Sequence, residues 1–248
     1  MIVNTYEWGD AGGPAVMCLH GVTGHGARYR ALAGRLPGRR VVGVDLRGHG
    51  HSGWEPPWGV AAHVADLLAT ADAIGIERAA WVGHSFGGLL VAELAARAPK
   101  RVECAVLLDP ALHVDAAVAR EQAEGLRQDV SFATSDEAIE ARLTGGTLFT
   151  TPRAVLEEEA EAHLEQGGDG RLRWRYSPVA AVVAWSEMAR PAPPFPSCRT
   201  LVVLGERSWI PVDVPSAAHS ETLTVPGGHS VLWDDFEATA DAIARFLG

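Results

Sequence analysis

The sequence predicts an α/β fold built on a mostly parallel β-sheet. Short apolar runs alternate with amphipathic segments through the first 110 residues, and the same alternation resumes near residue 200. The chain has 248 residues, of which 47% are apolar, enough for one large core. Alternating strands and helices imply parallel strands with helices on both faces.

The apolar runs of the first part predict buried strands, because each is short and bounded by turn residues. One leading strand is expected within "IVNTYEW". Four further strands are expected at 15–20, 39–46, 78–83 and 102–109. Helical periodicity covers 27–36, 60–76 and the segment after Ser85, "GLLVAELAARAP".

Residues 112–197 break the pattern, since they hold no convincing strand and predict helices only. Those helices are expected at 115–128, 135–143, 151–166 and 178–189. A proline-rich return leads to strands at 200–205 and 221–227 and a last helix at 234–248. We therefore expect seven or eight strands, a core formed by 1–111 and 198–248, and a helical cap at 112–197 inserted before the strand at 200–205. An insertion of this length beside a site usually forms a lid.

Charge and cysteine usage exclude several classes of protein. The formal net charge is −10, which disfavours nucleic acid and anionic membranes as partners. The three cysteines show no spacing typical of a metal site or a disulfide framework. No leader pattern and no apolar run of ~18 residues is visible. We expect a cytoplasmic protein without metal or cofactor. The acidic run Glu157, Glu158, Glu159 and Glu161 predicts a solvated helix face.

Ser85 stands in "VGHSFGG", between a predicted strand and a predicted helix. Gly83 and Gly87 frame it as G-x-S-x-G, a turn so tight that bulky residues at either glycine would clash. The turn holds the hydroxyl at the carboxyl edge of the sheet, and the N–H of Phe86 points into the same space. This context predicts a nucleophile rather than a simple helix-capping serine.

A serine nucleophile needs a base, and His229 is the best placed of the ten histidines. It lies in "PGGHSVLWDDF", a glycine turn between the last strand and the last helix. His84 is expected to point away from the site, and structural roles are expected for His20, His49 and His51. Acyl transfer also needs two oxyanion donors, one from Phe86 and the other from the loop at 20–26.

These motifs, taken in order, resemble the α/β-hydrolase family over nearly the whole chain. The matching pieces are "LHGVTGHG", "VDLRGHGHS", "VGHSFGG", the helical cap and "PGGHSVLWDDF". The resemblance implies a Ser–acid–His triad in that chain order, and an oxyanion hole formed by the backbone N–H groups of Val22 and Phe86. It assigns no catalytic role to Asp45, Arg47 or Ser52.

The acid departs from the family pattern. The family most often places an aspartate after the strand that follows the cap, where this chain has "GERS" with Ser208. Some members place the acid on the strand next to the nucleophile's strand, and here that strand ends in Asp109. We favour Asp109, with Asp213, Glu206 and a missing acid as alternatives.

The expected substrate is a small or medium apolar carboxylic ester, cleaved through an acyl-enzyme. No basic cluster is evident that would hold a polyanion. Bulky cap residues divide between the cap's own core and the pocket wall, and the wall is expected to come from Leu112, Phe132, Phe149, Trp174 and Trp185, with Leu148 and Tyr176 as further candidates. One rival hypothesis is a different reaction on the same triad: lactone opening, carbon–carbon bond hydrolysis or perhydrolysis. The other is a hydrolase-like ligand receptor with little turnover.

Overall fold

A computed structural model describes residues 1–128, 130–145, 148–215 and 219–248. Its main sheet has seven strands in the order β1-β3-β2-β4-β5-β8-β9, with β1 antiparallel to β3 and the other pairs parallel. The fold prediction is confirmed, including the single leading strand. The strands are β1 (Thr5–Gly9), β2 (Ala15–Leu19), β3 (Arg40–Val44), β4 (Ala79–His84), β5 (Val102–Leu108), β8 (Thr200–Gly205) and β9 (Ser220–Val225).

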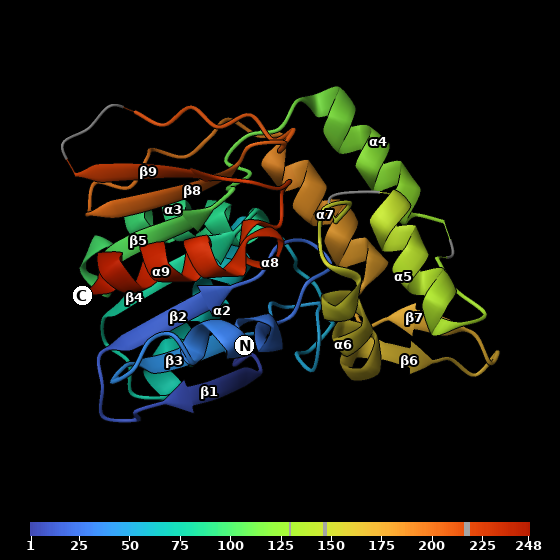
Figure 1. Cartoon of the computed structure of the whole chain (residues 1–248), viewed down its shortest axis with the longest axis horizontal. Coiled ribbons are helices and arrows are strands. Elements are labelled where there is room, and N and C mark those ends of the chain that lie inside the picture. Colours follow the sequence, from blue (N-terminus) through green and yellow to red (C-terminus); the bar gives the residue numbers. More distant parts are fainter. Residues whose placement is uncertain (129, 146–147, 216–218) are drawn as a thin grey trace.

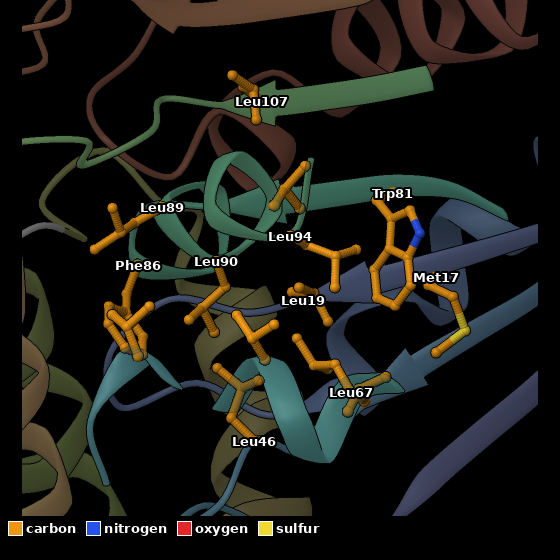
Figure 2. Close-up of a cluster of buried hydrophobic side chains, with 14 of the residues drawn as sticks. Met17, Leu19, Leu46, Leu67, Trp81, Phe86, Leu89, Leu90, Leu94 and Leu107 are labelled. Carbon is orange, nitrogen blue, oxygen red and sulfur yellow. The ribbon is translucent and has the colours of Figure 1, made fainter. Parts of the chain in front are cut away.

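Helices cover both faces of this sheet (Figure 1). One face carries α1 (Arg30–Ala33) and α9 (Phe236–Leu247), and the other carries α2 (Val60–Ala73) and α3 (Phe86–Arg97). Alternate residues of β2 therefore enter different cores: Val16 and Cys18 pack with the first layer, and Met17 and Leu19 with the second. Figure 2 shows the second core, where Trp81 and Leu67 lie beside Met17.

The expected helix at 27–36 is shorter than its sequence pattern. A 3₁₀ turn, η1 (Gly26–Tyr29), precedes the four residues of α1, and Gly34 ends that helix. The glycine lowers helix propensity, and turn hydrogen bonds continue the chain to Leu36. Leu32 and Leu36 are still buried against the sheet.

Residues 112–197 lie together on one side of the sheet (Figure 1). The described residues of this segment form four helices, as predicted, and also a short antiparallel pair, so the expectation of helices only is wrong. The elements are α4 (Ala116–Leu126), α5 (Ser135–Thr144), α6 (Arg153–His163), β6 (Leu164–Gln166), β7 (Leu172–Trp174) and α7 (Pro178–Met188). Each strand has three residues, too few for an alternating pattern to be visible in the sequence.

This segment contacts loops that follow the strands of the main sheet. Ser177 donates its N–H to Gly48, after β3, and the N–H of Gly228, after β9, donates to Thr150. In a parallel sheet the loops after the strands share one edge, so the segment sits at the carboxyl edge. Its own apolar cluster includes Phe132, Leu156 and Trp174.

The described residues include neither a membrane-spanning helix nor a metal-binding cluster. In the described part of the chain, no helix has the length and apolar character needed to cross a membrane. Across residues 1–128, 130–145, 148–215 and 219–248, no group of three or more His, Cys, Asp or Glu side chains is arranged to hold a metal ion.

Candidate active site

Ser85 occupies a strained turn between β4 and α3. Its backbone has φ 53° and ψ −117°, a conformation that costs free energy and is held by its surroundings. A Cβ at Gly83 would lie 2.3 Å from the carbonyl oxygen of Gly87, and a Cβ at Gly87 would lie 2.4 Å from that of Leu19. Both framing glycines are therefore required by contact with backbone, as the sequence motif predicts.

His229 lies in the loop between β9 and α8 (Val231–Asp234), and its side chain is buried. Its Nδ1 is 2.6 Å from Oδ2 of Asp109, across 120 positions of sequence. Asp109 directly follows β5, with φ 41°, and its N–H donates to the carbonyl of Val203 at 2.7 Å. The structure thus brings together the histidine and the aspartate favoured from the sequence.

Ser208 supports the carboxylate of Asp109. Its hydroxyl donates to Oδ2, and the N–H of Gly205 donates to Oδ1 at 3.1 Å. The residue at the family's usual acid position is therefore a hydrogen-bond donor to an acid on the neighbouring strand. Glu206 and Asp213, the alternatives, are both exposed, and it is Asp109 that reaches Nδ1 of His229.

Four other histidines considered in the sequence are held by hydrogen bonds or close contacts. His84 was expected to point away from the site, but it lines the pocket with Ser85 and His229, and its Nε2 donates to the carbonyl oxygen of His229 at 2.9 Å. Burial is the main cause that holds the pKa of His84 well below its usual value, and the nearby His229 is the second cause. His84 is therefore neutral. His20 accepts from the N–H of Leu46 at 3.0 Å, and His49 accepts from the N–H of Thr23 at 3.3 Å. His51 lies beside the guanidinium of Arg175.

Val22 and Phe86, expected to supply the oxyanion N–H groups, lie in the loop after β2 and directly after Ser85. Phe86 is the first residue of α3, where an N–H has no partner within the helix. Its ring is fully buried, in edge contact with the ring of His63. Val22 lines the same pocket as Ser85.

One pocket is lined by Ser85, His229 and residues of the segment at 112–197. Its empty volume, including space open to solvent, is about 380 Å³. It is lined by Gly21, Val22, Thr23, Arg28, His84, Ser85, Arg142, Leu148, Trp185, His229 and Ser230. Of the bulky cap residues expected in the wall, Trp185 and Leu148 are there.

The structure does not bring the other expected residues to the wall. Phe132 and Trp174 pack in the cap's own core, because α5 and α6 need an apolar interior of their own. Leu112 is buried away from the pocket. Phe149 is 42% exposed, and its ring lies beside Gly228 rather than Ser85.

Sequence reasoning missed a charged cluster between the core and the cap. Glu159 of α6 is only 5% exposed, so placing it on a solvated helix face was wrong. Arg28 binds both of its carboxylate oxygens, at 2.6 and 2.8 Å, and His25 and Arg142 contact it at 2.5 and 3.3 Å. The hydropathy pattern of α6 could not reveal that Glu159 is buried, because the residues that bind its carboxylate come from other segments of the chain.

A parallel sheet with a serine at the β4–α3 turn and a histidine–aspartate pair at the same edge defines the class of α/β hydrolases. A family model described as the alpha/beta hydrolase fold matches residues 14–210. The chain belongs to this family.

Individual relatives agree with this membership. The chain is 38% identical to lipase LipV of Mycobacterium tuberculosis, over 82% of this chain and 78% of the lipase. It is 28% identical to the sn-1-specific diacylglycerol lipase ABHD11 of Mus musculus, over 96% of this chain and 82% of that protein. The solved structure of E-2-(acetamidomethylene)succinate hydrolase is similar, with a TM-score of 0.85 and 25% identity over 99% of this chain and 94% of that one.

Proposed function

We propose that this protein hydrolyses carboxylic esters through an acyl-enzyme formed on Ser85. His229 removes the proton of the serine hydroxyl and returns it to the leaving alcohol. Asp109 holds the imidazole in the tautomer that presents Nε2 to the serine and stabilises the imidazolium that forms. The N–H groups of Val22 and Phe86 bind the oxyanion of each tetrahedral intermediate, and water attacks the acyl-enzyme with His229 as base.

The observation that carries the proposal is the 2.6 Å contact between His229 Nδ1 and Asp109, beside a pocket that His229 shares with the strained Ser85. The two relatives named as lipases support ester hydrolysis over other reactions. We further propose that residues 112–197 act as a cap, with Leu148 and Trp185 forming apolar wall above the serine.

The test is hydrolysis of 4-nitrophenyl butyrate by the wild type and by Ser85→Ala. We expect the variant to lose on the order of 10⁴-fold or more in turnover. The matched control is Ser186→Ala, an exposed cap serine, which should keep full activity. A fluorophosphonate should label Ser85 in the wild type, as detected by peptide mass spectrometry.

Two results would contradict the proposal. If Ser85→Ala keeps more than about a tenth of the activity, the acyl-enzyme mechanism is wrong. If the wild type releases one equivalent of nitrophenol and then stops, the protein is a receptor. Lactone opening would use the same groups, and a lactone panel run beside the ester shows which substrate the pocket prefers.

A further inference from the structure

Two buried guanidinium groups share the pocket with Ser85. Arg28 comes from η1 of the core and Arg142 from α5 of the cap, and both line the pocket. Their side chains are only 9% and 11% exposed. The chain as a whole carries a net charge of −10, so two arginines beside the nucleophile run against the charge of the molecule.

One carboxylate serves both arginines. Glu159 lies 2.6 and 2.8 Å from the nitrogens of Arg28 and 3.3 Å from Arg142. Burial lowers the pKa of His25 against the opposing effect of Glu159, so this histidine adds no charge at neutral pH. The cluster therefore holds two positive charges and one negative charge.

Among the described residues, Glu159 is the carboxylate that forms ion pairs with the two arginines. The buried carboxylate of Asp45 accepts from the N–H of Gly26 instead. The carboxylate of Asp109 is already bound by His229, Ser208 and Gly205. Burial raises the pKa of the Tyr176 phenol, which stays neutral. Burial lowers the pKa of Arg142 to about 10, with Glu159 opposing, and a group with that pKa is protonated at neutral pH.

Arg142 is the arginine with donors to spare. A guanidinium has five N–H donors in a planar fork. The acceptors of Arg142 are Glu159, at 3.3 Å, and the carbonyl of Thr23, at 3.4 Å, and both contacts are long. The ring of Trp174 covers one face, 3.7 Å from the guanidinium carbon. Thr23 follows Val22, so the group lies beside the proposed oxyanion hole.

We propose that the pocket selects esters that carry a carboxylate close to the scissile bond, and that Arg142 binds this carboxylate while Arg28 supports it. The inference rests on the proposed ester hydrolysis and changes its substrate class from a purely apolar ester to an acidic one. A planar fork matches a carboxylate with two hydrogen bonds, which are strong in a water-poor site. The apolar wall of Leu148 and Trp185 accommodates the remainder of the substrate.

The test compares an acidic ester with a neutral one of equal length. The substrates are mono-4-nitrophenyl glutarate and 4-nitrophenyl pentanoate, and the quantity is the ratio of their kcat/KM values. In the wild type we expect the acidic ester to be favoured by about tenfold or more. Arg142→Gln should lower that ratio by about tenfold, chiefly through the KM of the acidic ester, and Arg142→Lys should keep part of it.

Arg120→Gln is the matched control, because Arg120 is an exposed arginine of the cap. It should leave the ratio unchanged. A role for Arg142 only in joining cap to core would lower both kcat/KM values together, and an unchanged ratio in Arg142→Gln would overturn the proposal. A wild-type ratio of one or less would overturn it as well.

A binding measurement separates this inference from the proposed function. Glutarate should inhibit hydrolysis of the neutral ester competitively, and glutaramide should inhibit at least about tenfold less. If neither ester is turned over, the proposed function fails. Calorimetry with glutarate on wild type and Arg142→Gln then decides the anion site: binding lost in the variant supports it, and no binding by the wild type overturns it. If Arg142→Gln does not fold, the comparison of glutarate with glutaramide on the wild type still tests the anion site.

Discussion

Asp109 has a left-handed backbone conformation, and its carboxylate has three hydrogen-bond partners. Its φ is 41°, and its carboxylate accepts hydrogen bonds from the N–H of Gly205, the hydroxyl of Ser208 and Nδ1–H of His229. Donors to a carboxylate stabilise its ionised form. Ser208 is therefore a positioning residue, and the strain at Asp109 is offset by a fully bound side chain.

Asp109→Asn should fold normally and lose much of its turnover. An amide can favour the tautomer that turns a proton, rather than a lone pair, toward Ser85, and the analogous change in a serine protease costs about 10⁴-fold. The measurement is kcat on 4-nitrophenyl butyrate, with Asp213→Asn as control, since Asp213 is exposed and should cost far less. Adding Ser208→Asp to the Asp109→Asn variant should restore part of the rate, because Ser208 already contacts Asp109. A larger loss in Asp213→Asn would refute the assignment of the acid.

At the scale of elements, α6 is joined to the core by a buried charge. Burial by itself would raise the pKa of Glu159, but Arg28, His25 and Arg142 hold it well below its usual range. A second connection runs from Thr150 through Asp234 to Gly228, at 2.6 and 2.7 Å, next to His229. The segment at 112–197 is thus bound both beside the loop that follows β2 and at the loop that carries His229.

Glu159→Gln should destabilise the protein strongly. It leaves two buried guanidinium groups without their counter-charge, and breaking such a cluster typically costs about 3–5 kcal/mol. The measurement is the free energy of unfolding in urea. Glu158→Gln is the matched control, because Glu158 is exposed on the same helix and should change stability by less than about 0.5 kcal/mol. Equal, small effects of the two variants would show that the buried contacts contribute little.

At the scale of the whole molecule, several histidines of the described chain are neutral because they are buried. Burial is the main cause of a lowered pKa in each, to about 4 for His49 and His63 and about 3 for His163. The same holds, by direction, for His20, His25 and His84. These residues come from the loops after β2 and β3 and from α2, β4 and α6, so their protonation affects several parts of the fold.

Stability should therefore fall as the pH drops. Above about pH 6.5 these histidines are neutral in both states. Between about 6.5 and 4 the unfolded chain binds protons that the folded chain does not, so each such histidine costs up to about 1.4 kcal/mol per pH unit. Tm should drop by about 10 °C or more from pH 7.5 to 5, measured by calorimetry.

Variants assign this slope to the buried histidines. His63→Gln should flatten it, because His63 is buried with an unpartnered Nδ1 among the described residues. His113→Gln should not, since His113 is exposed. A Tm that stays constant between pH 7.5 and 5 would contradict the prediction.

Local physics made the fold class and the turn at Ser85 predictable from the sequence. Apolar runs of strand length, helical periodicity and two glycines that tolerate no side chain each depend on residues close together in the chain. The resemblance carried by these motifs also indicated His229 and favoured Asp109. The three-residue strands β6 and β7 and the shortness of α1 could not be predicted, because these elements depend on tertiary contacts rather than on a sequence pattern.

Tertiary structure alone decided what surrounds the serine. Asp109, Ser208 and His229 converge only because β5, β8 and β9 are neighbours in the sheet. The apolar cap residues look alike in sequence, and only packing separates Trp185 in the pocket from Trp174 in the cap's core. Arg28, Arg142 and Glu159 are ordinary surface residues by composition. Burial and mutual contact, which depend on segments more than a hundred positions apart, turn them into a charged wall beside Ser85.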